Sequence, residues 1–289
     1  MGRIATIGFF DGVHRGHCFL FEHLHIEAQT RKLSPLIVTF DRHPRSVLQA
    51  DYIPRLLTTL DERTELLKPF GEVVVFPFEE ICRLTAGEFM QRLRDDYQVQ
   101  TILMGYDHRF GADRLRHPVD YRRAGETLGL EIITQGEYID GEWHVSSTEI
   151  RQALEKGNIA VANELLGRPY QISGIVVHGN GIGRTIGFPT ANIRPSDAQK
   201  IIPRPGVYGV EINSEALIGR NCCKGILNIG TNPTVGNKET TIELHIPNYE
   251  GDLYGTSLSV RFLEFIREEK RFDNLIQLKK QIAEDISNL

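Results

Sequence analysis

The chain has few cysteines, no long apolar run and no excess of positive charge. Its four cysteines, Cys18, Cys82, Cys222 and Cys223, show no Cys-x-x-Cys spacing, so we expect free thiols rather than a disulfide framework. No apolar run reaches the ~18–20 residues of a membrane span, and the apolar start Ile4–Phe10 is too short for a signal peptide. These absences predict a cytoplasmic protein without a membrane partner.

Neither half of the chain is basic. Division at Gly167 gives 19 Lys and Arg against 25 Asp and Glu before it, a net −6, and 14 against 13 after it, a net +1. Nucleic-acid binders usually carry a basic excess, so we expect no nucleic-acid partner. An anion site must then be built from a few placed groups. The oligomeric state does not follow from the sequence.

Short apolar β-branched runs alternate with helical stretches through residues 3–137, which predicts βαβ units and a parallel, doubly wound α/β sheet. The expected strands are Ile4–Phe9, Leu36–Phe40, Val73–Phe76, Thr101–Gly105 and Leu130–Thr134, and the expected helices are Cys18–Thr30, Leu60–Phe70, Thr85–Tyr97 and Val119–Leu128. Two further helices, Ser147–Lys156 and Ile159–Leu166, end at a Gly-Arg-Pro stop. We therefore predict domains over residues 1–167 and 168–289.

The second domain is predicted to be an antiparallel barrel, because short strands recur there with turn residues between them. These strands are Ile172–His178, Gly206–Ile212, Gly225–Ile229, Thr240–Ile246 and Ser257–Phe265. A closing helix is expected over Asn274–Ile286, with Asp273 as its N-cap.

The first predicted strand runs into a glycine-rich turn with two histidines, Gly8-Phe9-Phe10-Asp11-Gly12-Val13-His14-Arg15-Gly16-His17. Such a turn lets the backbone approach phosphates, and the following helix N-terminus favours anions. His14 and His17, three apart, could both stabilise charge that builds on the α-phosphate of ATP. A tight turn with two hydrogen-bonded histidines is the alternative. The spacing favours a nucleotide site with Gly8, Phe10, Asp11, Gly12 and Gly16.

Ser146-Ser147-Thr148-Glu149-Ile150-Arg151 forms a second polar run at a helix start. A single serine there is usually a cap, but Thr148 and Arg151 share a helical face and could bind polyphosphate together. Both motifs together are typical of the nucleotidyltransferase superfamily. The related class I tRNA synthetases would need a larger body and an RNA-binding surface.

Two polar clusters, Thr39–Pro44 and Gly105–Gly111, follow the second and fourth predicted strands. Each alone is more often a loop, but both fall at one edge of the sheet, where ligands bind. We therefore predict that His43, Asp107 and Arg109 line the rim of the site.

On these motifs, the N-terminal half resembles the FMN adenylyltransferase domain of the bacterial bifunctional riboflavin kinase/FAD synthetase family. The shared runs are Phe10-Asp11-Gly12-Val13-His14-x-Gly16-His17, His43-Pro44, Asp107-x-Arg109-Phe110-Gly111 and Ser147-Thr148-x-x-Arg151. The chain has Arg42 where the family usually has proline, His108 where phenylalanine is common, and Glu149 where the family has arginine. The resemblance implies that FMN and ATP are substrates here.

Gly179-Asn180-Gly181-Ile182-Gly183-Arg184 is not a dinucleotide fingerprint, because neither frame gives Gly-x-Gly-x-x-Gly. From the glycines alone, a hairpin turn and a loop that covers phosphates through Gly179, Gly181 and Gly183 are equally supported. Thr190 and Asn192, two apart on an extended chain, share a face and supply neutral oxygens that suit Mg²⁺ held mainly by ATP and water. No common kinase motif is present.

In Thr240–Ile246, apolar residues alternate with Thr241, Glu243 and His245, which by itself describes a half-buried strand with a solvated polar face. The longer pattern nevertheless resembles riboflavin kinase, through Gly174-x-Val-x-His-Gly, Gly187–Asn192, Asn228–Thr234, Glu243-x-His245-Ile246, Asp252–Gly255 and Phe265–Phe272. The resemblance implies a six-stranded Greek-key barrel that phosphorylates the ribityl 5′-hydroxyl of riboflavin. It makes Thr190 and Asn192 the magnesium and phosphate contacts, Glu243 the base, and Arg267 part of the flavin rim.

The two resemblances span nearly the whole chain and imply a bifunctional enzyme that converts riboflavin to FMN and FMN to FAD, releasing pyrophosphate. An adenylyltransferase for pantetheine phosphate or nicotinamide mononucleotide would leave the Pro-Thr-Ala-Asn barrel unexplained. A barrel that binds oligonucleotides would need surface aromatics and a basic groove, and the net +1 argues against it.

Overall fold

The computed structural model describes residues 2–140, 143–179, 183, 187–217, 223–234, 237–270, 272 and 274–287. The chain divides into two compact units, residues 1–147 and 148–289. The helices α7 (Ser147–Lys156) and α8 (Ile159–Leu166) have the predicted bounds, and α8 ends at Gly167 in the left-handed conformation, φ 73°. The domain boundary at Gly167 stays a prediction. No helix that the structure describes has the length and apolarity to cross a membrane.

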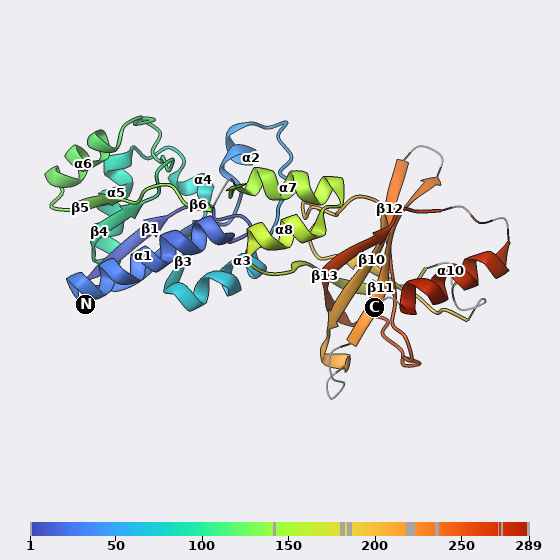
Figure 1. The fold of residues 1–289 in the computed structure, drawn as a ribbon. Helices are drawn as coiled ribbons and strands as arrows, with labels where there is room; N and C mark the ends of the chain where they lie inside the picture. The colour runs from blue at the N-terminus through green and yellow to red at the C-terminus, as the bar shows by residue number, and fades with distance from the viewer. Residues whose placement is uncertain are drawn as a thin grey trace. The chain divides into compact units, whose positions relative to one another are not determined.

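The first unit is built on five parallel strands in the order β3-β2-β1-β4-β5, which confirms the predicted doubly wound sheet (Figure 1). The strands are β1 (Arg3–Ile7), β2 (Ser34–Phe40), β3 (Glu72–Phe76), β4 (Val99–Met104) and β5 (Glu131–Thr134). The chain order reverses between β1 and β4. Ligands bind in such sheets outside the carboxyl ends of the strands, at the point of reversal. The loops after β1 and β4 flank that point.

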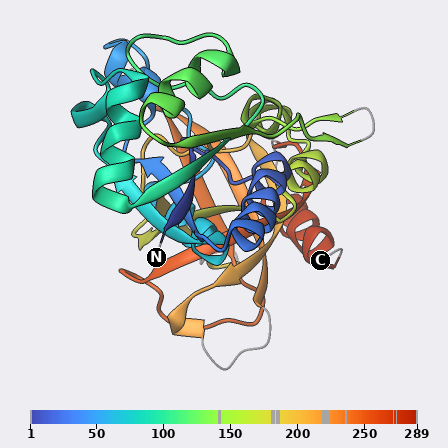
Figure 2. The same ribbon diagram turned by 90° about the vertical axis from the view of Figure 1, so that its left-hand side faces the viewer.

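Helices cover both faces of the sheet, which explains why its strands are mostly apolar (Figure 2). On one face, α1 (Arg15–Arg31) and α3 (Leu60–Leu67) pack on Ile4 and Ile37. On the other, α5 (Ala86–Tyr97) and α6 (Pro118–Thr127) pack on strand residues of the opposite alternation, such as Ala5. The predicted helix Leu60–Phe70 is present as α3 followed by η1 (Lys68–Phe70). The elements that the sequence did not predict are short: α2 (Pro44–Leu48), α4 (Phe78–Ile81) and the hairpin β6 (Ile139–Asp140) with β7 (Trp143–His144).

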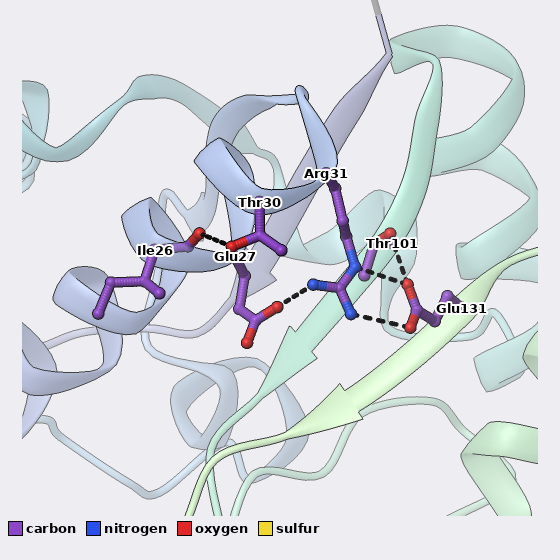
Figure 3. A network of polar contacts seen from close by, with 6 residues as sticks. All are labelled: Ile26, Glu27, Thr30, Arg31, Thr101 and Glu131. Carbon is purple, nitrogen blue, oxygen red and sulfur yellow. Dashed lines mark hydrogen bonds and ion pairs between the residues drawn. The ribbon is translucent and has the colours of Figure 1, made fainter.

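An ion network holds the C-terminal end of α1 to the edge of the sheet (Figure 3). Arg31 donates through Nε and Nη2 to the two carboxylate oxygens of Glu131, at 2.8 and 2.9 Å, and through Nη1 to Glu27. Thr101 donates to the same Glu131 carboxylate at 3.3 Å. Arg31 therefore joins α1 to Glu131, the first residue of β5. Glu131 lies at the amino-terminal end of the strands, and the loops after β1 and β4 lie at their carboxyl ends.

We expect Arg31→Met to destabilise the first unit by about 1 kcal/mol, because a two-pronged arginine pair is stronger than an ordinary surface pair. For a unit of this size that is a loss of about 2–4 °C in its melting temperature, measured by calorimetry. Lys68→Met, which removes an exposed pair with Glu65, is the matched control and should change little.

The same network predicts a pH dependence. Hydrogen bonding to Arg31 lowers the pKa of Glu131 in the folded chain. A lowered folded-state pKa gives stability that is present above the unfolded value, ordinarily about 4.3, and is lost as the pH falls through the folded value. The difference between wild type and Arg31→Met should therefore shrink in acid. If the stability difference between wild type and Arg31→Met stayed the same in acid, the difference would not come from the charge of Glu131.

The second unit contains a closed six-stranded antiparallel barrel in the order β10-β11-β12-β9-β8-β13, as predicted. Its strands are β8 (Tyr170–Val177), β9 (Ala191–Pro195), β10 (Gly206–Asn213), β11 (Cys223–Thr234), β12 (Asn237–His245) and β13 (Ser257–Arg267), and η2 (Glu215–Leu217) follows β10. The sequence predicted five of the strands and left β9 as extended chain. The closing helix α10 (Leu275–Ser287) is present, and Asn274 Oδ1 accepts from the N–H groups of Ile276 and Gln277 at 3.1 and 3.0 Å. The predicted cap Asp273 lies outside the described residues.

Candidate active sites

The turn after β1 has an unusual backbone. Phe10 and Val13 have positive φ values of 52° and 41°, and Gly12 has 83°. A positive φ is rare for residues with a side chain, and for a β-branched valine it is a real outlier. Such strain costs on the order of 1–3 kcal/mol per residue and collects at functional sites. The Val13 N–H donates to Phe10 O at 3.1 Å and closes the turn.

His14 and His17 lie side by side where this turn enters α1. His14 caps the helix, with Nδ1 accepting from the His17 N–H at 3.4 Å. The two rings are stacked, with centroids 3.6 Å apart and planes 18° apart. A Cβ on Gly16 would lie 3.3 Å from the His14 ring and from Val145 O, so glycine allows this close packing. The two imidazoles therefore lie together at the start of α1, and their action on the α-phosphate of ATP stays a prediction.

Gly8 and Asp11 hold the turn after β1 in its conformation. A Cβ on Gly8 would lie 2.6 Å from the Phe10 ring, which packs over it. The Asp11 side chain is buried, and its carboxylate accepts from the N–H groups of Leu57 and Thr58 at 3.0 Å and from the Thr58 hydroxyl at 3.1 Å. Gly12 N–H also donates to Thr58 Oγ1, at 3.0 Å. Asp11 thus anchors the turn to residues 57–58, which the sequence analysis missed.

Ser147, the first residue of α7, donates through its hydroxyl to Asp11 O at 2.9 Å. The second predicted motif therefore begins in contact with the turn after β1. Thr148 and Arg151 follow in the part of α7 that belongs to the second unit. Their contact with ATP stays a prediction.

The predicted rim residues lie in loops at the carboxyl ends of β2 and β4. His43 caps α2, with Nδ1 accepting from the Arg45 N–H at 3.1 Å, and its ring meets that of Phe9 edge-on at 4.9 Å. Asp107 and Arg109 are exposed in the loop after β4. Desolvation lowers the pKa of His108 between them to about 4, so its ring is neutral at pH 7.

The barrel contains a cavity of about 400 Å³ that gathers the predicted kinase residues. Its lining includes Gly183, Thr190, Asn192, Glu243 and Arg267, together with Glu269, Phe272, Leu278, Ile282 and Asp285 from the C-terminal segment. Gly179 is not part of this lining, and Gly181 lies outside the described residues. Five predicted positions from three separate parts of the sequence thus meet in one cavity, of the size in which small-molecule substrates bind.

The two described glycines of the predicted loop, Gly179 and Gly183, pack directly on the predicted magnesium ligands. A Cβ on Gly179 would lie 2.0 Å from Asn192 Nδ2, and one on Gly183 would lie 2.3 Å from Phe188 O and 3.2 Å from Thr190 Oγ1. Only glycine allows so close an approach. Whether these glycines also cover phosphates, as one of the two readings of the sequence holds, stays a prediction.

Glu243 faces Asn192 across the β12–β9 pairing and lies in the cavity wall. Burial raises the pKa of Glu243, and the negative charge of Glu269 raises it further. On the same strand face, His245 is 9% exposed, and its Nδ1 lies 2.8 Å from Pro189 O. The polar face of β12 therefore lines the cavity and is not the solvated face that the alternation alone allowed.

Arg267 is held by an aspartate that the sequence analysis missed. Its Nε lies 3.0 Å from both carboxylate oxygens of Asp285, and its Nη2 donates to Oδ2 at 2.7 Å. Asp285 is 2% exposed and lies on α10. The pair fixes the end of β13 to the closing helix, beside the cavity. Asp285 lines the cavity together with Leu278 and Ile282 of the same helix, and a single acidic residue gave no motif by which to find it.

The structure thus offers two candidate sites, a turn with two stacked histidines after β1 of a doubly wound sheet and a cavity in a six-stranded barrel. Family models described as FAD synthetase and riboflavin kinase match residues 1–149 and 166–289. Relatives named bifunctional riboflavin kinase/FMN adenylyltransferase are 40% identical in Escherichia coli (strain K12) and 33% identical in Bacillus subtilis (strain 168), over 98% of this chain and 90% of each relative. The chain belongs to the bifunctional riboflavin kinase/FMN adenylyltransferase family, as its motifs predicted.

A solved structure supports the fold of the chain. The crystal structure titled as a macrolide-efflux protein from Streptococcus pneumoniae matches with a TM-score of 0.89 and 32% identity, over 99% of this chain and 93% of its own.

Proposed function

We propose that the first unit transfers AMP from ATP to FMN and that the second transfers the γ-phosphate of ATP to riboflavin. The chain's family membership assigns both activities, with riboflavin, FMN and ATP as substrates. The division between units is supported above all by the stacked His14–His17 pair in one and the Thr190–Asn192–Glu243 cavity in the other.

In adenylyl transfer, a phosphate oxygen of FMN bonds to the α-phosphorus of ATP while the bond to the β-phosphate oxygen breaks and pyrophosphate leaves. Negative charge builds on the α-phosphate oxygens. We assign its stabilisation to His14 and His17. Contact of Thr148 and Arg151 with the polyphosphate stays a prediction from the sequence. Gly8, Phe10, Gly12 and Gly16 shape the turn. Asp11 is assigned a positioning role, because its carboxylate is occupied by residues 57–58.

We place FMN against the rim formed by His43, Asp107 and Arg109. These residues lie in the loops that follow β2 and β4. Both loops are at the carboxyl ends of the parallel strands, where the turn after β1 also begins. Ligand binding at that edge is general for open parallel sheets.

In the kinase reaction, the riboflavin 5′-oxygen bonds to the γ-phosphorus of ATP while ADP leaves. Glu243 takes the hydroxyl proton, and its raised pKa makes it a better match for that task. Thr190 and Asn192 fit Mg²⁺, because both supply hard oxygen donors and both line the cavity. Bound magnesium would neutralise phosphate charge. Arg267, held by Asp285, is assigned to the flavin side of the cavity.

We also propose that the enzyme works in the cytoplasm. Both activities consume ATP, and the free thiols of Cys18, Cys82 and Cys223 fit a reducing compartment.

Isotope labelling tests the proposal. With riboflavin as the flavin substrate, label from γ-labelled ATP should enter FMN and then FAD. Label from α-labelled ATP should enter FAD and never FMN. FAD without the α label would contradict adenylyl transfer, and FMN without the γ label would contradict the kinase assignment.

A further inference from the structure

Arg63 is a buried cation that none of the assigned steps uses. It lies on α3, and its residue is 1% exposed. Its Nη2 donates to Phe40 O at 2.5 Å, and its Nε is buried without a hydrogen-bond partner among the residues that the structure describes. Burying a charge is costly unless surrounding groups compensate it. A buried cation beside the loops of a candidate site therefore suggests a role in that site.

The guanidinium lies where the loops after β1 and β2 meet. Phe40 is the last residue of β2, and Phe9 belongs to the loop that follows β1. The guanidinium carbon lies 4.1 Å from the centroid of the Phe9 ring. That ring in turn meets His43 edge-on at 4.9 Å. A chain of direct contacts thus runs from Arg63 through Phe9 to the rim.

The charge of Arg63 is balanced by carboxylates of the same two loops. Burial lowers the pKa of Arg63 to about 10, and the charges of Asp11 and Asp41 oppose that change, so the side chain stays protonated at neutral pH. Both carboxylates hold backbone N–H groups, Asp11 those of Leu57 and Thr58, and Asp41 that of Phe78 at 2.8 Å. Arg63 therefore neutralises two groups that anchor these loops.

We infer that Arg63 is a positioning residue for adenylyl transfer, which fixes the loops after β1 and β2 against each other and, through Phe9, holds His43 in place for FMN. The inference rests on the proposed function, because it takes the rim to bind the flavin. The direct contacts of Arg63 run to Phe9 and Phe40. Asp11, which its charge also balances, has its own hydrogen bonds from Leu57 and Thr58 to anchor the turn that carries His14 and His17. The loss of Arg63 should therefore weaken FMN binding more than ATP binding.

The test is steady-state FAD formation by the full chain, with FMN and ATP varied in turn. Arg63→Met keeps the length and apolar contact with Phe9 but removes the charge and the hydrogen bond. We expect its KM for FMN to rise roughly tenfold or more, since small misplacements near a site have effects of that order. Its KM for ATP and its riboflavin kinase rate should stay within about twofold. Arg63→Lys, which keeps a charge and a donor, should recover most of the loss.

A folded Arg63→Met with an unchanged KM for FMN would overturn the inference, and so would equal rises in both KM values. If Arg63→Met does not fold, Phe9→Leu replaces it, because that change breaks the contact with His43 and leaves the Arg63 hydrogen bond. An unchanged KM for FMN in Phe9→Leu would be equally decisive. The His14→Ala/His17→Ala variant distinguishes a failure of the positioning role from a failure of the proposed function. If it loses FAD formation while the Arg63 and Phe9 variants bind FMN normally, the positioning role alone is wrong.

Discussion

Replacing both His14 and His17 by alanine should abolish FAD formation and leave riboflavin phosphorylation intact. The stacked rings at the start of α1 are placed to donate to charge that forms only as the α-phosphate is attacked. Loss of one such donor typically costs about 10²–10³ in rate, so loss of both should bring adenylyl transfer close to background. The measurement is FAD formation from supplied FMN, with kinase turnover on riboflavin recorded on the same preparation.

The matched control is His25→Ala, which removes an imidazole from the same helix, where its Nδ1 lies 3.1 Å from Phe21 O, away from the turn. It should leave both activities near wild type. A folded double variant that still makes FAD at the wild-type rate would return the two histidines to a purely structural role.

Glu243→Gln should lose most kinase turnover while binding riboflavin and ATP–Mg²⁺ almost normally. A primary hydroxyl gives up its proton poorly at neutral pH, and general-base assistance is typically worth about 10²–10⁴ in rate. Glutamine keeps the size and hydrogen-bonding reach in the cavity wall but cannot take the proton. Adenylyl transfer to supplied FMN should continue, since the glutamate belongs to the other unit.

Turnover is measured as FMN formation, and binding as the change in riboflavin fluorescence on titration. Glu264→Gln is the matched control, because Glu264 is an exposed glutamate on a barrel strand outside the cavity lining. If turnover in Glu243→Gln is barely altered while riboflavin binding collapses, Glu243 is a binding residue and not the base.

The parts of the fold that the sequence predicted are those with a repeating apolar pattern. β1, β2 and β4 are buried on both faces and therefore read as continuous apolar runs. β9 is only five residues long, ends in Arg-Pro and has one fully buried position, so it gave no alternation. α2 and α4, with five and four residues, are too short to show a helical period.

The site residues that could be predicted are those that lie close together in the sequence. His14 and His17 share one turn of helix, and Thr190 and Asn192 share one strand face, so their spacing alone indicated a shared role. Thr58 reaches Asp11 across 47 positions, and Asp285 reaches Arg267 across 18. No local pattern connects such pairs, because tertiary packing brings them together. The role of Arg63, which lies in an ordinary helical stretch, could not be predicted from the sequence for the same reason.

The central claim is that one chain makes FMN and then FAD with two separate ATP-dependent sites. The most direct test is to incubate the purified protein with riboflavin, ATP and Mg²⁺ and to separate the flavins by chromatography over time. FMN should appear first, and FAD should follow with one pyrophosphate released per FAD. Accumulation of FMN without any FAD, under every divalent metal tried, would contradict the claim.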